Sequence, residues 1–295
     1  MELNYIVDKD NLNIKLRDVL SYFHISHRLL ITLKNENAIL VNGETTYIDK
    51  PLKLNDKINI NFDYEEDNSN IVPTKIDLDI VYEDDWIIII NKPSNLTVHP
   101  TMMHYDDSLS NGIRYYFDQI GLKKKIRPVN RIDKDTSGLV VFAKCEYIQE
   151  ELKNQMANDI FKKEYTTIVE GILDNKKGII DAPISRKEGS IIERCVDDKG
   201  APSITEYEVL NENKEKNYSL IKCDLKTGRT HQIRVHFSYI GHPLLGDDLY
   251  GGKLDLMSRQ ALHCSKITFI HPITKKQMEI TSELAEDMKR LLALG

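Results

Sequence analysis

The residues with the clearest capacity for chemistry lie between Arg131 and Asp135, where the sequence reads Arg-Ile-Asp-Lys-Asp. The apolar run Leu139–Phe142 follows a Ser-Gly turn and predicts a buried strand. Loops that meet a core strand commonly carry catalytic groups on a rigid scaffold. Asp133 is therefore a candidate catalytic carboxylate, although the same residues could equally form an ion-paired turn.

Several other kinds of catalytic or binding site are excluded because their sequence motifs are absent or incomplete. Asp133-Lys-Asp-Thr136 resembles the aspartate motif of haloacid-dehalogenase-like phosphatases, but it is one residue too short and its apolar strand follows instead of preceding it. The chain has no G-x-G-x-x-G, G-x-S-x-G or H-E-x-x-H, and the glycine-rich stretch 244–252 lacks the Lys-Ser/Thr ending of a phosphate-binding loop. The four cysteines are widely spaced, which argues against a zinc site or a disulfide framework.

The net charge of −6 argues against a nucleic-acid partner, but the distribution of charge along the chain matters more than the total. Acidic residues gather at 63–67 and 77–85, whereas the basic run Lys123–Arg127 lies next to Arg131. Such a run either forms a local phosphate-binding face or is simply solvated. The longest apolar run, Trp86–Ile90, is too short to cross a bilayer and no secretory signal is evident, so we expect a cytoplasmic protein with no membrane partner.

The first 62 residues predict a small α/β domain. Apolar residues at helical spacing indicate a helix over 12–22 and a second helix that begins near Ser26 as its N-cap. A strand over 38–43 ends in an Asn-Gly turn, and an alternating strand covers 52–60. Residues 63–75 are polar and acidic, and we expect them to form a linker.

Residues 76–295 predict a larger domain of the α+β class with a mainly antiparallel sheet. The alternating segments 204–210 and 218–225, joined by a charged turn, indicate neighbouring antiparallel strands. Helices are predicted at 107–117, 146–157, 227–240 and 282–293, and further strands at 79–90, 162–171 and 262–269.

Three features of the N-terminal part occur together. His27-Arg28 lies between the predicted helices, and Ile39-Leu-Val-Asn-Gly43 and Leu54-Asn-Asp-Lys-Ile58 follow. In this order they resemble the S4 domain, a small RNA-binding module. The resemblance implies RNA contacts from the basic residues of this part, which are Lys15, Arg17, His27, Arg28 and Lys34.

Six ordered sequence blocks cover most of the remaining chain. They are Tyr82–Pro93 with His99-Pro-Thr101, Arg131–Leu139, Lys163-Glu-Tyr165 with Val169-Glu-Gly171, Thr227–His236, Gly241–Asp247 and Ala261-Leu-His263. Together they resemble the RluA-type pseudouridine synthases, which isomerise uridine in ribosomal or transfer RNA, and with the S4-like front they resemble the RluD-like, large-subunit branch. One departure is Asn130, where the family commonly has His; we interpret it as a hydrogen-bonding loop residue.

The resemblance implies a reaction that breaks the N1–C1′ bond of uridine, rotates the base and joins C5 to C1′, with no cofactor, nucleotide or metal. Asp133 would be the nucleophile or base. Arg234 would keep that carboxylate charged in a closed pocket. Tyr165 would stack on the uracil and offer a hydroxyl for proton transfer, and Leu262 would pack on the other face of the base.

A uridine in structured RNA must leave its stack before an enzyme can reach C1′. Arg131 would fill the vacated space, and Arg229 would meet a phosphate from another face of the helix predicted at 227–240. His231 is interpreted as structural, and Asp135 as either a partner of the site or a turn cap. The flanking RNA backbone would be held by Lys123, Lys124, Lys125 and Arg127.

Three other functions remain open: a tRNA-directed pseudouridine synthase, a non-catalytic rRNA-binding assembly factor and a glycoside-cleaving enzyme. The presence of Asp133, Tyr165 and Arg234 argues against a decayed active site. The glycoside-cleaving enzyme would need a second acid, and Asp135 would face elsewhere on a turn or strand. We expect a monomer that acts on RNA, ribosomal before transfer RNA, with a pre-ribosomal particle as a further candidate partner.

Overall fold

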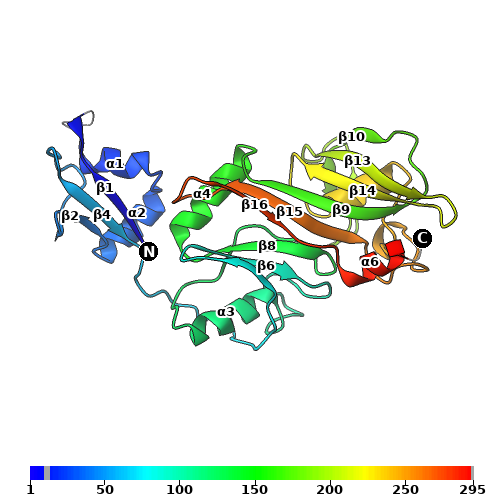
Figure 1. Cartoon of the computed structure of the whole chain (residues 1–295), viewed down its shortest axis with the longest axis horizontal. Helices are drawn as coiled ribbons and strands as arrows, with labels where there is room; N and C mark the ends of the chain where they lie inside the picture. The colour runs from blue at the N-terminus through cyan, green and yellow to red at the C-terminus, as the bar shows by residue number, and fades with distance from the viewer. Residues whose placement is uncertain (10–13, 294–295) are drawn as a thin grey trace.

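The computed structural model describes residues 1–9 and 14–293. The elements of its N-terminal part are β1 (Glu2–Ile6), α1 (Leu16–Tyr22), α2 (His27–Asn35), β2 (Ile39–Val41), β3 (Glu44–Thr45) and β4 (Lys57–Asn61). The strands form an antiparallel sheet in the order β1-β4-β2-β3, with both helices beside it (Figure 1). Positions 12 and 13 of the first predicted helix lie outside the described residues.

Local signals account for much of this part. The hydroxyl of Ser26 accepts a hydrogen bond from the N–H of Leu29 at 3.1 Å, so Ser26 is the N-cap of α2 as predicted. Asn42 and Gly43 both have positive φ, 54° and 85°, as a two-residue hairpin turn requires. The first strand, β1, was not predicted.

A ten-stranded sheet forms the larger part. Its strands are β5 (Ile80–Glu83), β6 (Ile87–Lys92), β7 (Arg127–Pro128), β8 (Ser137–Ala143), β9 (Lys162–Glu170), β10 (Lys177–Asp181), β13 (Ile204–Asn213), β14 (Tyr218–Leu225), β15 (Leu262–Ile270) and β16 (Gln277–Thr281). The main order is β10-β13-β14-β9-β15-β8-β6-β5, and β7 and β16 pair with β8 and β15. All pairs are antiparallel except β8 with β15, so the sheet is mixed and the α+β class is confirmed.

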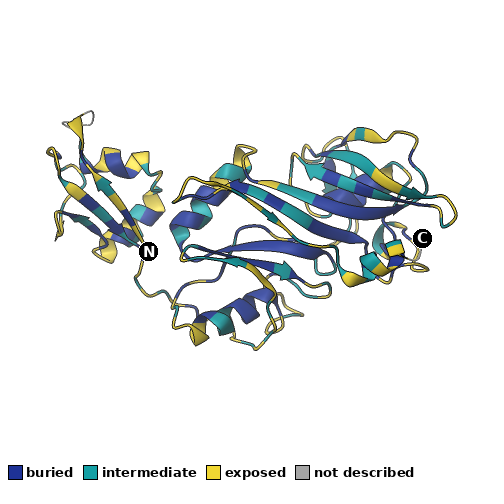
Figure 2. Ribbon diagram, in the orientation of Figure 1, coloured by how far each residue is buried: buried dark blue, intermediate teal, exposed yellow. Residues whose placement is uncertain are grey.

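The remaining elements are a small hairpin and four helices. They are β11 (Ile184–Arg186) with β12 (Arg194–Val196), α3 (Leu109–Gln119), α4 (Glu146–Ala157), α5 (Gln232–Tyr239) and α6 (Glu286–Ala293). The core runs along β6, β8 and β9, and every residue of β8 is buried (Figure 2). Within the described residues, no helix has the length and apolar character needed to span a bilayer.

Helix α4 lies between the N-terminal sheet and the large sheet (Figure 1). Its acidic residues meet the start of α2: Ser26 Oγ donates to Glu150 Oε1 at 2.9 Å, and Arg28 Nε lies 3.3 Å from Glu146 Oε1. Residues 63–75, expected to form an acidic linker, also take part in packing. Glu66 in this segment is almost completely buried in an ion pair with the main part of the protein.

Three predicted helices are shorter than expected, and the first of them, α1, begins only at Leu16. The segment 227–240 becomes helical only at Gln232, because His231 has a left-handed backbone with φ 58° and cannot continue a helix. Helix α6 begins at Glu286 and not at residue 282, because β16 extends as far as Thr281. The strands β1, β3, β7, β10, β11, β12 and β16 were not predicted.

Candidate active site

Asp133 lies in the loop between β7 and β8, and Asn130 fixes the start of that loop. Asn130 Nδ2 donates to the carbonyl of Leu139 at 3.1 Å, and its Oδ1 accepts from the N–H of Val141 at 2.8 Å. The amide side chain therefore pairs with β8 as a neighbouring strand would. The N–H of Thr136 donates to the carbonyl of Asp133 at 3.2 Å and closes the following turn. The interpretation of Asn130 as a hydrogen-bonding loop residue is confirmed.

Lys92, at the end of β6, holds the other side of this loop. Its buried ammonium donates to the carbonyls of Pro93, Leu96 and Lys134 at 2.8, 2.8 and 2.9 Å. Burial lowers the pKa of Lys92 to about 7. Because Lys134 directly follows Asp133, this three-point contact restricts the backbone beside the candidate carboxylate.

Gly138 allows the strand that leaves the loop to approach β15. It has φ +109°, and a Cβ at this position would lie 2.3 Å from the carbonyl oxygen of Cys264. The two residues are register partners in the parallel pairing of β8 with β15. This close contact brings the Asp133 loop beside Leu262, the first residue of β15.

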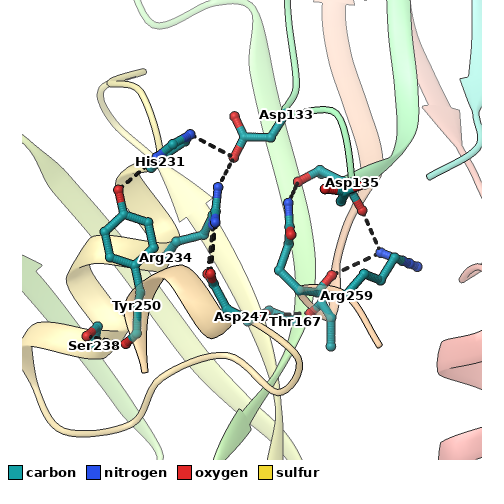
Figure 3. Close-up of polar contacts among 12 residues, drawn as sticks. Asp133, Asp135, Thr167, His231, Arg234, Ser238, Asp247, Tyr250 and Arg259 are labelled. Carbon is teal, nitrogen blue, oxygen red and sulfur yellow. Dashed lines mark hydrogen bonds and ion pairs between the residues drawn. The ribbon is translucent and has the colours of Figure 1, made fainter. Parts of the chain in front are cut away.

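Arg259 supports the same loop through its backbone. Nη1 donates to the carbonyl of Asp135 at 2.9 Å (Figure 3). Nε and Nη2 donate to the two carboxylate oxygens of Asp287 at 2.6 and 2.8 Å. Asp135 thus contributes a main-chain acceptor to this support. Arg259 and Asp287 were not among the predicted site residues.

Arg234 reaches the candidate carboxylate from α5. Its Nη1 donates to Asp133 Oδ2 at 3.1 Å, while Nε and Nη2 donate to the two carboxylate oxygens of Asp247 at 2.7 and 2.8 Å (Figure 3). Burial alone would lower the pKa of Arg234, but Asp247 and then Asp133 raise it above its ordinary value. A permanently charged guanidinium is therefore fixed against one oxygen of Asp133.

The main predicted site residues line one cavity of about 60 Å³; they are Asp133, Tyr165, Arg234 and Leu262. A larger open pocket of about 530 Å³ adjoins it and shares Asp133 with it. The two hollows together offer a narrow inner site and a wider approach to it. This shape suits a flat ring that enters from a larger molecule.

Tyr165 lies on β9 and is almost completely buried. Burial raises the pKa of its hydroxyl well above 10, and Cys264 and Asp133 add to the shift. The hydroxyl therefore stays protonated, so it can donate a hydrogen bond but is a poor base. Its ring remains available for stacking.

His231 is part of the site, contrary to its interpretation as structural. Its Nε2 lies 3.9 Å from Asp133 Oδ2, and its Nδ1 lies 2.7 Å from the hydroxyl of Tyr250 (Figure 3). His231 is one of nine histidines in the chain, and its position in the sequence gave no indication that its side chain lies near Asp133.

Arg229 precedes α5, so the prediction that it shares a helix with Arg234 is wrong. The backbone N–H of Arg229 donates to Gln232 Oε1 at 3.0 Å, and its Nε donates to the carbonyl of Pro202 at 3.3 Å. Its exposed side chain lines both pockets, as does that of Arg131. The two arginines therefore flank the approach to Asp133.

The predicted basic run contains two residues that are not available to RNA. Lys124 is buried, and its ammonium donates to the carbonyls of Phe62 and Tyr64. Arg127 is buried in its ion pair with Glu66. Their expected contact with RNA is corrected, because both charges hold the segment after β4 against the larger sheet.

The other predicted RNA-binding cations are at the surface. Lys123 pairs with Glu65 at 2.8 Å with both side chains largely exposed, a geometry that contributes little to stability and is easily exchanged for another anion. The remaining exposed members of the set are Lys125, Arg17, His27, Arg28 and Lys34, whereas Lys15 is half-buried.

Asp247 and Tyr250 are two further site residues that the sequence did not single out for a role. Asp247 is almost completely buried, and the ring of Tyr250 lies 4.9 Å from the guanidinium carbon of Arg234. A signal was present, because both belong to the glycine-rich stretch 244–252. An acidic residue beside glycines gave no indication of its partner.

An anchored carboxylate, a buried aromatic ring and an arginine-flanked approach therefore meet at one place in this fold. The family model described as RNA pseudouridylate synthase matches residues 86–239. The RNA pseudouridine synthase YjbO of Bacillus subtilis, itself described as uncharacterised, is 37% identical over 91% of this chain and 94% of its own. The chain therefore belongs to the RNA pseudouridylate synthase family.

Other relatives agree, and the resemblance to the RluA-type enzymes is confirmed. Ribosomal large subunit pseudouridine synthase D of Zymomonas mobilis is 39% identical over 75% of this chain and 74% of its own. That of Blochmanniella floridana is 33% identical over 99% and 94%. Human RNA pseudouridylate synthase domain containing 1 has the same fold, with a TM-score of 0.59 at 23% identity over 74% of this chain and 94% of its own.

Proposed function

We propose that this pseudouridine synthase isomerises uridine in large-subunit ribosomal RNA and that Asp133 is the reacting carboxylate. The observation that carries the catalytic part is the fixed pair of Asp133 and Arg234 in the cavity that Tyr165 and Leu262 also line. The ribosomal substrate rests on two relatives named as ribosomal large subunit pseudouridine synthase D.

The geometry supports a separate role for each side chain around the uracil ring. Arg234 occupies Oδ2 of Asp133, which leaves Oδ1 to attack C1′ or to abstract a neighbouring proton. Tyr165 stacks on the uracil and donates its hydroxyl proton as a hydrogen bond, because its raised pKa keeps that proton in place. Leu262 packs on the opposite face of the ring.

The RNA itself is held by exposed cations around this site. Arg131 enters the space that the extruded uridine leaves, and Arg229 meets a phosphate beside it. Lys123 and Lys125 contact the flanking backbone. In the N-terminal part, which we propose to be an S4-like domain of residues 1–62, Arg28 and Lys34 add affinity and target choice.

The remaining assignments follow from this function. We propose that residues 63–75 connect the S4-like domain to a catalytic domain of residues 76–295. An enzyme that modifies large-subunit RNA would act on a pre-ribosomal particle in the cytoplasm. A monomer is supported by the cavity that Asp133, Tyr165, Arg234 and Leu262 of one chain line together. The chemistry proposed needs no cofactor.

The direct test compares RNA from cells with and without the gene. Loss of one or a few pseudouridines from large-subunit RNA is the expected result, and an unchanged map of ribosomal RNA with a site lost from transfer RNA would overturn the proposed substrate. Purified Asp133→Asn should release no tritium from 5-tritiated uridine in a large-subunit transcript while still binding it. Tritium release at the wild-type rate would overturn the role of Asp133.

A further inference from the structure

Tyr250 connects the active site to the hairpin of β11 and β12. Its hydroxyl accepts a hydrogen bond from the backbone N–H of Arg194 at 2.9 Å and lies 2.7 Å from His231 Nδ1. The opposite ring nitrogen of His231 faces Asp133. A chain of polar groups therefore runs from a backbone amide to the candidate catalytic carboxylate.

The hydrogen bonds around Tyr250 favour one placement of the protons on Tyr250 and His231. Burial raises the pKa of Tyr250, so its hydroxyl keeps its proton. One lone pair of that oxygen accepts from Arg194, and within the described residues the hydroxyl's nearest acceptor is His231 Nδ1. The reverse arrangement, with Nδ1–H donating to the hydroxyl, would leave the phenolic proton without a side-chain or backbone acceptor among the described residues.

If Nδ1 accepts, a neutral His231 carries its proton on Nε2. The groups that face the imidazole are Asp133, Arg234, Asp247, Arg194 and Tyr250. Burial is the largest influence on its pKa and lowers it, Arg234 and Arg194 lower it further, and Asp133 and Asp247 oppose them. The net result is a neutral ring with one N–H directed toward Asp133.

The backbone of His231 is consistent with a residue held in place for function. It has φ 58° and ψ 20° at the N-cap of α5, a left-handed conformation that is uncommon for a residue with a side chain. The carbonyl of His231 also accepts the N–H of Val235 at 2.9 Å as the first turn of the helix. The ring is thus fixed at one end by α5 and at the other by Tyr250.

Both cationic and neutral donors converge on a single oxygen of Asp133. Arg234 Nη1 lies 3.1 Å and His231 Nε2 lies 3.9 Å from Oδ2. The second distance is too long for a hydrogen bond in the free enzyme, but contacts of this kind commonly shorten when the substrate is bound. A neutral donor can orient the carboxylate of Asp133. A second positive charge at this place would instead reduce the nucleophilicity of that carboxylate.

We propose that His231 is a positioning residue, whose Nε2–H, fixed by the hydrogen bond from Tyr250, binds Asp133 Oδ2 when uridine enters and presents Oδ1 to C1′. This inference rests on the proposed role of Asp133. His231 acts through Asp133, and Tyr250 acts through His231.

The first test needs no RNA, so its outcome does not depend on the proposed substrate. Nitrogen-15 chemical shifts of the full chain labelled on histidine report which ring nitrogen carries the proton, and the His231 signal is assigned by its loss in His231→Gln. We expect Nε2–H in the wild type near pH 7 and a mixture of tautomers in Tyr250→Phe. A wild-type ring with its proton on Nδ1 would overturn the proposal.

The second test compares two substitutions of similar size. Gln can place an N–H where His231 Nε2 lies, whereas Met cannot. With a 5-tritiated large-subunit transcript in single turnover, we expect His231→Met to lose about tenfold to a hundredfold in rate at unchanged RNA affinity and His231→Gln to recover most of that loss. Equal rates for Met and Gln, with both proteins folded, would show a merely structural residue and overturn the proposal.

A pH profile separates positioning from packing for Tyr250. The hydroxyl donates to the neutral form of His231, so its removal should raise the pKa of the ring and move the acid limb of the rate profile to higher pH. Tyr250→Phe should show this shift. An unshifted limb in a folded Tyr250→Phe protein would contradict the chain from Tyr250 through His231 to Asp133.

Discussion

Asp247 binds Arg234 through both of its carboxylate oxygens, and Arg234 can therefore offer only its remaining nitrogen to Asp133. The guanidinium has a planar, rigid set of donors, so fixing Nε and Nη2 also fixes the direction of Nη1. The position of the charge beside Asp133 is consequently determined by a residue that does not line the 60 Å³ cavity.

The first prediction concerns this pair. Asp247→Asn leaves a buried guanidinium without its main counter-charge, so the free energy of unfolding should fall by about 3 kcal/mol. The rate of isomerisation should fall as well, because Nη1 is no longer directed at Asp133. Urea unfolding and tritium release measure the two effects. Asp248→Asn alters the exposed neighbour and serves as the control; equal stability of the two variants would contradict the role of Asp247.

The second prediction tests the contact of Gly138 with Cys264. Gly138→Ala places a Cβ 2.3 Å from a backbone oxygen that cannot move without separating β8 from β15, so we expect a loss of about 3 kcal/mol in unfolding free energy. Gly189→Ala is a matched control, since Gly189 also has a positive φ, 76°, but no atom lies within 4 Å of its added Cβ. Its loss should be about 1 kcal/mol. Similar losses for both would show that φ alone, and not the contact, is responsible.

A third prediction concerns extrusion of the uridine. Arg131→Ala should slow isomerisation of a structured RNA about tenfold more than that of a single-stranded RNA of the same sequence, because only the structured RNA must be unstacked. Single-turnover rates on the two RNAs provide the measurement. Lys177→Ala removes a largely exposed cation on the edge strand β10 and should change neither rate. A uniform loss on both RNAs would argue for a phosphate contact at Arg131 instead.

The fourth prediction is a pH dependence of stability. His263 is fully buried beside Ser137, and burial lowers its pKa to about 4 from an ordinary value of 6.5. Between these two values the unfolded chain binds a proton that the native protein does not, so stability decreases as the pH falls from 6.5 to 4. The loss attributable to this group is about 3 kcal/mol.

The measurement is urea unfolding of the wild type and of His263→Gln at several pH values between 7 and 4. Carboxylates contribute to both proteins, so the difference between the two curves isolates the histidine. The wild-type curve should be steeper across this interval. Parallel curves would show that His263 titrates normally in the folded protein.

The elements with strong local signals were predicted well. Helix α4 has the bounds Glu146–Ala157 that the spacing of its apolar residues indicated, and β13 and β14 are antiparallel neighbours. The unpredicted strands include β10 at the end of the sheet order, and β1 and β16, which each pair with a single strand. These three strands are each five residues long, so each contains little periodic signal. The left-handed His231 likewise follows from tertiary contacts that no window of sequence contains.

For the active site, the types of residue in the motifs indicated which groups would meet, but the sequence did not indicate where each side chain would lie. The pairing of Asp133 with Arg234, and the common cavity with Tyr165, could be expected from the family resemblance. The burial of Lys124 and Arg127 could not, because a run of basic residues has the same sequence whether its charges bind RNA or backbone carbonyls. Asp247 was missed for the related reason that an ion pair is recognisable only once both partners are placed.

The parallel pairing of β8 with β15 also bears on how the enzyme is made. Ser137 and His263, hydrogen-bonded at 2.9 Å, are 126 residues apart in the chain. Contacts of such long sequence separation close large loops and form slowly. During synthesis, Asp133 would leave the ribosome well before the strand that completes its pocket, so an incomplete chain has Asp133 but no enclosed site. Catalytic competence should therefore arise late and all at once, and fragments that end before β15 should be inert.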